Sequence, residues 1–518
     1  MASGNYDLWV DWDNDGNYSS ANDDITSDTL RVSYSRGRDF ASQLTGNSTA
    51  GKLTATLVNN DGKYSPDNTA SALTGKIKPG LSIKLTGGEG ASFPFTFPFA
   101  FDESTQWVGR LERIMPSPSS TSLKTAQLQA FGVLGYLNDF TPTISTLTDK
   151  RTDEAIDAIL DAVSWPEADR DLAEGETTMT KFWVRDKKTI SALRIPEETE
   201  AGFLYETKDG KIGFQNRLTR LTSPFNTSQA TFSDASGATN TYVSIKQADP
   251  LSTIANHLEA SSRSYTTGAL AVLWTLSETG ANSPLLVAGE SKTFIAKYPS
   301  SISDRNALEV DTWTTPASTT DYTANSASDG SGTNLTSDIG ISTTKTATEM
   351  VITVTNTSGS TSAYLTKLQA RGTPVTSSDP VTVRAIDTDS QTTYGDRKVV
   401  AETEFIPNTE QAQFWCDYNL QIYSSPVQIL SMTVVAGANS GNLAQVVERT
   451  INDRITVVAN NDAQLGINAD FFIEAERHVI GPAGEHTVTW DLSPAEGGYS
   501  QFWVLNTGKL GTSTVPAF

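Results

Sequence analysis

Alternation of apolar and polar residues marks the first 148 residues of this 518-residue chain as β structure. Leu53, Ala55 and Leu57 alternate with polar residues, as expected for a strand that is buried on one face. The dipeptides Asp61-Gly62 and Pro79-Gly80 are typical of tight turns between such strands. The same period of two recurs at Tyr6–Trp12, Leu30–Tyr34, Leu81–Leu85 and Leu128–Ala130. The pattern predicts a β-barrel or sandwich over residues 1–148.

The periodicity changes at Asp149. Apolar residues between 155 and 163 recur at helical spacing, with Thr152 or Asp153 as the expected N-cap. A second helix is expected from about residue 188, either ending near 194 or continuing past a proline to residue 200. A strand at 180–184 and a hairpin around 208–211 complete the pattern. Residues 149–225 are therefore interpreted as a small α/β module.

Three further segments follow the module. Residues 226–254 are interpreted as a connecting segment. Residues 255–372 are rich in Ser and Thr and predict an inserted β-sandwich. Residues 373–518 contain a helix capped by Asn408 or Thr409, several strands and a C-terminal strand.

Several stretches contain sequence motifs that are more specific than the alternation of apolar and polar residues. They are Asn60-Asp-Gly-Lys-Tyr-Ser-Pro66 with Gly75-Lys-Ile-Lys-Pro-Gly80, Trp107–Ile114, Gly175–Val184, Asp209–Phe214, Asp470–His478 and Thr487–Pro494. Together they resemble the tail-hub proteins of long-tailed bacteriophages, which are also labelled minor tail or tail-tip proteins.

The resemblance implies a mainly β fold, in which two β-barrel hub domains at 1–148 and 373–518 carry the inserted α/β module and the inserted sandwich. It also implies a structural virion protein that forms a homotrimeric hub at the distal end of the tail tube. Such a hub closes the channel and scaffolds the tail tip for DNA delivery. The expected partners are a distal tail ring protein, a tape-measure protein, and tail-fibre or receptor-binding proteins. The expected location is the tail tip of the virion, after synthesis in the host cytoplasm.

Composition narrows the possible partners. The chain has 60 acidic and 38 basic residues, a formal net charge of −22, so no specific nucleic-acid binding is expected. No run of about 18 apolar residues occurs, and hence no transmembrane segment is predicted. The N-terminus lacks the pattern of a signal peptide. Cys416 is the single cysteine, which excludes a disulfide framework within the chain.

The stretch from Asp11 to Asn17 is the sharpest candidate for a metal site. Asp11, Asp13 and Asp15, followed by glycine, match the opening of a calcium loop, because a hard cation needs several oxygens on a tightly turned backbone. The twelfth position is Asn22, so the usual bidentate glutamate is missing. The motif Asn-Asp-Gly-x-Tyr-Ser, found at residues 14–19, occurs again at residues 60–65 without the preceding acidic residues. This repetition favours a hairpin turn that binds no metal. Calcium and a metal-free turn both remain open; no other cofactor is expected.

A run of five phenylalanines lies between residues 93 and 101. Its prolines exclude a central strand. Phe95, Phe97 and Phe99 therefore either pack onto their own domain or contact a neighbouring subunit.

Enzyme motifs are weak throughout the sequence. The histidines are His257, His478 and His486, and no serine-hydrolase, zinc-protease or P-loop pattern is present, so we expect no enzyme. His478 and His486 flank a turn and are interpreted as a cross-strand pair. The alternative function is a β-rich protein that binds or hydrolyses carbohydrate, with Trp274 and Trp313 of the sandwich as stacking platforms or, instead, as core aromatics.

Overall fold

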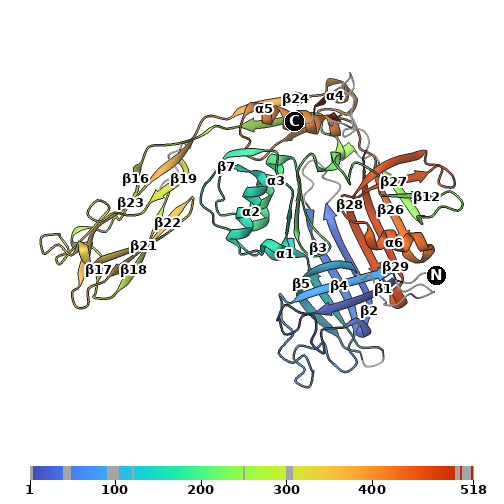
Figure 1. Ribbon diagram of the computed structural model, residues 1–518, viewed down its shortest axis with the longest axis horizontal. Helices are drawn as coiled ribbons and strands as arrows, with labels where there is room; N and C mark the ends of the chain where they lie inside the picture. Colours follow the sequence, from blue (N-terminus) through green and yellow to red (C-terminus); the bar gives the residue numbers. More distant parts are fainter. Residues whose placement is uncertain are drawn as a thin grey trace.

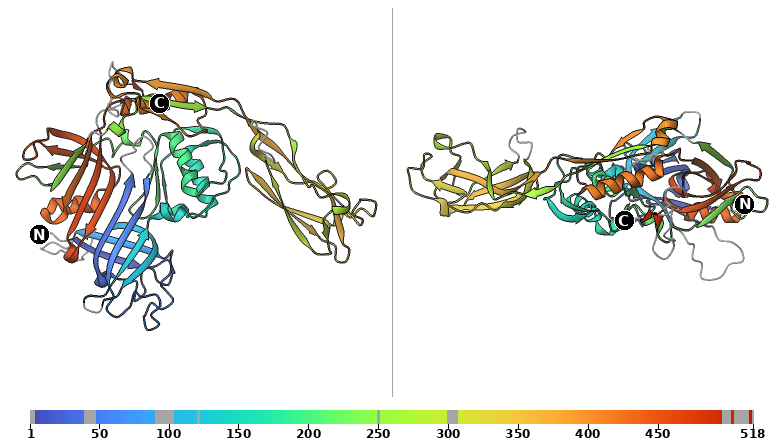
Figure 2. Two further views of the ribbon diagram at one scale, coloured as in Figure 1. Left: turned by 180° about the vertical axis from the view of Figure 1, so that it is seen from behind. Right: turned by 90° about the horizontal axis from the view of Figure 1, so that it is seen from above.

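The computed structural model describes residues 4–38, 48–89, 104–119, 122–248, 251–298 and 307–495, and the backbone of two short strands, Phe502–Trp503 and Val515–Pro516. The chain is mostly β. Two β lobes and an α/β module lie together, and a sandwich projects from them as an arm (Figures 1 and 2). No helix in the described ranges is long and apolar enough to cross a membrane.

The first lobe is a curled sheet with the strand order β1-β4-β5-β6-β3-β2. Its strands are β1 (Gly4–Val10), β2 (Thr29–Arg38), β3 (Ser48–Val58), β4 (Ser82–Glu89), β5 (Ser104–Ser117) and β6 (Thr125–Phe131). The predicted alternation is seen in β3, where Leu53, Ala55 and Leu57 are buried and the residues between them are not. They pack with Leu8 and Trp107 in one core.

The second lobe combines strands from two distant parts of the chain. They are β12 (Ala230–Ser233), β13 (Ser244–Ala248), β26 (Ile429–Val435), β27 (Arg454–Ala459), β28 (Ile467–Ile480) and β29 (His486–Pro494), with helix α6 (Ser440–Glu448) beside them. β12 pairs with β27, and β13 pairs with β26. The segment 226–254, expected to be only a connection, thus supplies two strands of this lobe.

Both lobes belong to one 12-stranded sheet. The join is the antiparallel pair of β2 and β28, from Val32 opposite Ile480 to Gly37 opposite Ala475. Beyond this pair, Ile480 enters the core of the first lobe, and the turn η9 (Pro482–Gly484) contacts β1. No sheet closes into a barrel within the described residues. The two expected barrels are therefore corrected to two lobes of one open sheet, because β28 pairs with β2 where a closed barrel would need β1 to do so.

The α/β module packs two short sheets against its helices. Its elements are α1 (Val133–Leu137), β7 (Leu147–Arg151), α2 (Thr152–Ala162), β8 (Arg170–Leu172), β9 (Thr178–Phe182), α3 (Thr189–Glu200), β10 (Phe203–Glu206) and β11 (Ile212–Gln215). The predicted apolar face of α2 is buried from Ala155 to Leu160. Helix α2 begins one residue earlier than expected, with Arg151 as N-cap, and α3 continues through Pro196 to Glu200.

The arm is a sandwich of two sheets, one built around the long strand β23 and the other ordered β18-β22-β21. Its strands are β15 (Tyr265–Thr267), β16 (Ala271–Thr275), β17 (Leu285–Leu286), β18 (Ser291–Lys297), β19 (Ala307–Thr314), β20 (Tyr322–Asn325), β21 (Ile339–Lys345), β22 (Glu349–Asn356) and β23 (Ala363–Ser377). Trp313 is 4% exposed in its core, while Trp274 is half-buried against that core.

A three-stranded sheet links the arm to the lobes (Figure 1). It consists of β14 (His257–Ser262), β24 (Val381–Ile386) and β25 (Lys398–Val400), with α4 (Thr388–Tyr394) and α5 (Thr409–Tyr423) beside it. The Asn408 side chain accepts a hydrogen bond from Gln411 N, which confirms it as the N-cap of α5. Because β14 pairs with β24, residues 257–262 belong to this link rather than to the sandwich.

The close approach of β2 and β28 gives a first prediction. Gly37 has φ +120°, and a Cβ there would overlap the backbone of Glu474 and Ala475. Gly37→Ala should therefore lower the free energy of unfolding by about 3 kcal/mol, measured by urea denaturation. Gly237→Ala is the matched control, because Gly237 has φ +81° with nothing near its Cβ position; it should cost about 1 kcal/mol. Equal losses for the two variants would contradict the close approach.

Candidate functional site at the junction of the two lobes

Strand β28 brings three titratable side chains to the junction. Glu474, Glu476 and His478 are all buried there, and Glu474 lies in a bulge between Ile473 and Ala475. Glu476 forms an ion pair with Arg36 of β2, and the two side chains are 0% and 1% exposed. Burial alone would raise the pKa of Glu476, but Arg36 holds it well below its usual range. The carboxylate is therefore ionised, and the pair joins the two lobes through a fixed charge contact.

Glu474 makes a second charged contact, with Arg220 in the turn after β11. Arg220 Nη1 and Nη2 lie 2.7 and 3.0 Å from the two carboxylate oxygens of Glu474, a bidentate geometry. Arg38 Nε lies 3.5 Å away, and the Ser493 hydroxyl donates at 2.6 Å. Burial opposes ionisation, but Arg220 and Arg38 lower the pKa of Glu474 to about 2.

The two expected partner histidines are indeed adjacent. His478 Nδ1 lies 2.8 Å from His486 Nε2, and His486 Nδ1 lies 2.5 Å from the Tyr6 hydroxyl of β1. Tyr34 stacks on His478 at 4.3 Å between ring centroids. Burial lowers the pKa of both histidines, so both are neutral at pH 7. One tautomer set then fits throughout: Tyr6 donates to His486, His486 donates to His478, and His478 Nε2 faces Glu476 Oε2 at 3.6 Å.

Glu206 of β10 reaches from the module into the first lobe. Its carboxylate accepts hydrogen bonds from Gly51 N at 2.9 Å and from Leu134 N at 2.7 Å. Leu134 lies in the first turn of α1, whose N-cap Gly132 has no side chain to satisfy that amide. Glu206 therefore caps α1 from another element, and burial raises its pKa to about 7.

Lys208, in the turn after β10, reaches the second lobe instead. Its ammonium donates to Val447 O at 2.5 Å and to Glu448 O at 3.1 Å, the last carbonyls of α6. A cation at a helix C-terminus complements the helix dipole. Burial lowers the pKa of Lys208 to about 8. The β10–β11 hairpin thus places a carboxyl group at the start of one helix and an ammonium group at the end of another, and contacts both lobes.

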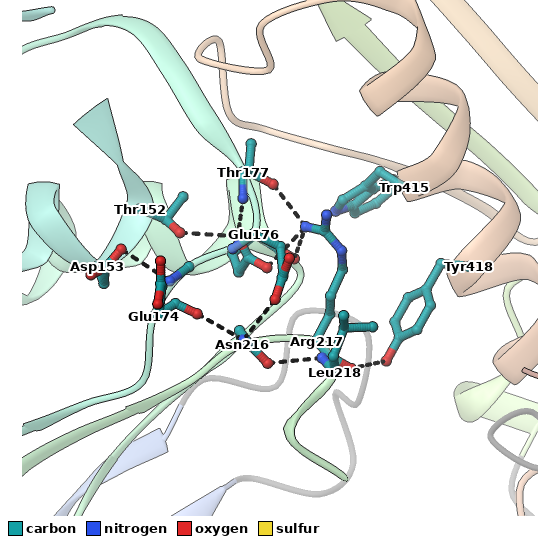
Figure 3. A network of polar contacts seen from close by, with 12 residues as sticks. Thr152, Asp153, Glu174, Glu176, Thr177, Asn216, Arg217, Leu218, Trp415 and Tyr418 are labelled. Carbon is teal, nitrogen blue, oxygen red and sulfur yellow. Dashed lines mark hydrogen bonds and ion pairs between the residues drawn. The ribbon is translucent and has the colours of Figure 1, made fainter. Parts of the chain in front are cut away.

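A buried ion pair within the module holds the Arg217 guanidinium beside α5 of the link (Figure 3). Arg217 Nη1 lies 2.9 Å from Glu200 Oε1 and donates to the Thr177 hydroxyl at 2.7 Å. Glu200 Oε2 accepts from the Thr152 hydroxyl at 3.0 Å. The Arg217 guanidinium stacks 4.8 Å from the ring of Phe414 on α5. The network therefore holds the Arg217 guanidinium of the module against Phe414 of α5.

The polar groups at the junction make structural contacts between the elements that meet there. The carboxylates are held by arginines or backbone amides, and the histidines are neutral and face other side chains. None of these groups lines a cavity described in the structure. The arrangement fixes the angle between the lobes and the module.

The Asp-rich loop brings its three acids together. One carboxylate oxygen each of Asp11, Asp13 and Asp15 lies within 4.8 Å of the others. The same carboxylates also accept hydrogen bonds from the loop: Asp11 from Asp15 N at 3.1 Å and Gly16 N at 3.0 Å, and Asp13 from a serine hydroxyl at 2.7 Å. The spacing suits a cation, but the loop is satisfied without one. Calcium stays a prediction.

The related turn at residues 60–65 has the same local structure. Asp61 Oδ1 accepts Lys63 N at 3.0 Å, as Asp15 Oδ1 accepts Asn17 N at 2.8 Å. The aspartate is thus needed for the turn in both places. Phe95, Phe97 and Phe99 lie outside the described residues, and their packing stays a prediction.

Sequence reasoning identified the histidine pair and the hairpin turn at 208–211. It missed Glu206, Lys208 and Arg36, because each contacts an element far away in the sequence. The sequence feature that could have indicated a buried polar site is the set of acidic residues on β28, a strand that is apolar from Phe471 to Ile473.

Comparisons with known proteins give structural matches alone. No family model and no curated protein matches the chain. A tail protein from Neisseria meningitidis matches with 10% identity and a TM-score of 0.49, covering 94% of this chain and 96% of that one. The 43 kDa tail protein of prophage MuSo2 from Shewanella oneidensis matches with 10% identity and a TM-score of 0.47, covering 95% and 99%. Prophage tail protein gp18 from Listeria monocytogenes matches with 8% identity and a TM-score of 0.41, covering 96% of each chain.

These structural neighbours are phage tail proteins. They are the kind of protein that the sequence motifs resemble. At such identities and TM-scores, the role of a residue in a neighbour is not transferred to this chain.

The Asp-rich loop can be tested with terbium, which replaces calcium in oxygen sites. Trp12 lies within the loop and should sensitise terbium luminescence, which millimolar calcium should displace. Asp13→Asn with Asp15→Asn should abolish the signal, and Asp61→Asn, in the related turn, should leave it unchanged. No calcium-sensitive signal in the wild type would show that the loop is a metal-free turn.

Glu206 gives a prediction about pH. Because its folded-state pKa is about 7 against 4.5 for an ordinary glutamate, the folded state holds the proton more tightly. Stability from this group is therefore present below pH 4.5 and lost as pH rises to 7, by roughly 3 kcal/mol. In Glu206→Gln that loss is absent, so the variant should gain on the wild type between pH 5 and pH 8 in urea unfolding. His478 and His486 oppose the trend in both proteins and cancel in the difference.

The control is Glu112→Gln, at an exposed position of β5. Its unfolding free energy should follow the wild type across the same pH range. A Glu206→Gln profile parallel to the wild type would contradict the burial of an easily protonated carboxyl group.

Proposed function

We propose that this chain is a structural virion protein that forms a homotrimeric hub at the distal end of a phage tail tube. The segments that resemble hub proteins support this, since several of them form strands of the two lobes. Residues 107–114 lie in β5, and residues 470–478 and 487–494 lie in β28 and β29. These motifs are thus spread over both lobes of the sheet.

The observation that carries the proposal is the open edge of the 12-stranded sheet at β13. Among the described residues, the main path of this sheet runs from β1 to β13. The outer side of β1 is covered by residues 23–26, since Ile25 N donates to Leu8 O and Val10 N donates to Asp23 O, both at 2.9 Å, whereas β13 ends the path. β13 is largely exposed on both faces, and Val243 just before it is 65% exposed. Unpaired strand edges bind other strands readily, so a lone chain would be prone to association. A ring in which β13 of each copy contacts the next copy would cover this edge.

Two lobes in each chain suit a ring of three copies. Such a ring would present six lobes, which matches the sixfold tube that the hub resemblance implies. In this proposal the distal tail ring protein and the tape-measure protein contact the lobes. The arm lies away from the lobes (Figure 2) and would contact tail-fibre or receptor-binding proteins at the tail tip.

The proposed role is assembly and closure of the channel rather than catalysis. The junction supports it, because a ring closes only if the angle between the two lobes of each copy is constant. No observation favours the carbohydrate alternative. Trp313 is a core residue whose indole donates to Thr346 O at 2.9 Å, so it cannot stack on a sugar.

The ring can be tested at the β13 edge. Val243→Asp adds a charge where the next copy would pair, and should convert a trimer in native mass spectrometry to a monomer. Val381→Asp is the matched control: Val381 is 52% exposed and begins the edge strand β24 of the link, outside both lobes. It should leave the trimer intact. Trimers of both variants, or a monomeric wild type at tail-assembly concentrations, would contradict the proposal.

A further inference from the structure

A basic pocket lies beside the Asp-rich loop, on the side of the first lobe that faces α1. Its volume is about 810 Å³, and its lining includes Lys76, Lys78 and Arg110, the ring of Tyr136, and one acid, Asp13. Within the described part of the chain, none of the three cations is ion-paired with a carboxylate. In a chain of net charge −22, three such cations around one hollow are unusual.

Local structure fixes the cations around the pocket. Lys76 and Lys78 are exposed and stand two residues apart before the Pro79-Gly80 turn. Arg110 comes from β5 and is held from both sides: its Nη1 donates to Gly80 O at 3.5 Å, and its guanidinium lies 5.5 Å from the Tyr136 ring. A pocket of this size exceeds what a single small anion fills, since sites of about 300–1,000 Å³ hold larger ligands.

A second cavity of opposite charge meets the first at Arg110. It has a volume of about 520 Å³ and is also lined by Asp11, Asp15, Asp169 and Asp209. A nucleic acid or polyphosphate carries the same negative charge along its length and would be repelled there. A peptide can present acidic residues to one cavity and basic residues to the other.

We propose that these two cavities bind a short mixed-charge peptide segment of a partner protein. Carboxylates of the segment contact Lys76, Lys78 and Arg110, and its basic residues contact the acid-lined cavity. The site is separate from the open strand edge at β13, so it does not depend on ring formation. Binding is expected to weaken with salt, because the lysines are exposed and their charges are screened.

The test uses the full-length chain and the probe peptide acetyl-Glu-Glu-Glu-Gly-Lys-Lys-amide, with affinity measured by calorimetry at low salt. We expect a Kd below about 1 mM in the wild type. Lys76→Gln with Lys78→Gln should weaken binding about tenfold, as expected for two exposed charge pairs. Both lysines are exposed, so the variant should fold; its melting temperature provides the check.

The matched control is Lys124→Gln with Lys297→Gln, which removes two exposed lysines elsewhere. It should bind the peptide like the wild type. Equal weakening in both double variants would show a general charge effect and overturn the proposal, as would no binding by the wild type. Hexaglutamate, a six-nucleotide DNA strand and inorganic phosphate are the competing probes. Tighter binding of any of these than of the mixed peptide would assign the pocket to a simple polyanion or anion and overturn the peptide proposal.

Discussion

The pairing of β2 with β28 is the constraint on which the rest of the structure depends. It joins residues about 440 positions apart and turns two lobes into one sheet. The hydrogen bonds between β2 and β28 join backbone groups, and they do not depend on the sequence of either strand. The side chains around these bonds decide the register, because Arg36 meets Glu476 and Arg38 meets Glu474 in this pairing and in no register shifted by one residue.

The buried ion pairs specify the arrangement of the elements more than they increase the free energy of unfolding. Removing an ion pair from water costs several kcal/mol for each charge, and the mutual attraction roughly offsets that cost. A partner lost from such a pair leaves an uncompensated charge, which is strongly destabilising. The junction uses this asymmetry twice, at Glu476 and at Glu474. Each pair therefore penalises alternative arrangements of lobes and module, as a protein that must close a ring requires.

Local features of the fold could be predicted from the sequence. The strand of Leu53, the apolar face of α2 and the Asn408 cap follow from spacing within a few residues, and the structure has each of them. The partner of a strand does not follow from spacing. Periodicity indicates that β28 is buried, but not that β2 buries it, so nothing in the pattern corrected the two barrels that the family resemblance implied.

The same limit applies to the site. His478 and His486 were recognisable because a turn lies between them. Glu206 and Lys208 look like ordinary charged residues beside a hairpin, and their roles at the ends of α1 and α6 come from tertiary contacts alone. Their burial, which moves their pKa values to about 7 and about 8, is not visible in composition.

Hydrogen exchange on the isolated chain tests most directly whether the two lobes form one body. If the β2–β28 join makes them one cooperative unit, amides of Val32–Gly37 and of Ala475–Ile480 will open together, with one free energy close to that of global unfolding. Exchange of the β2 amides well before those of β28, under conditions in which the second lobe stays protected, would show that the lobes are separate and contradict the account.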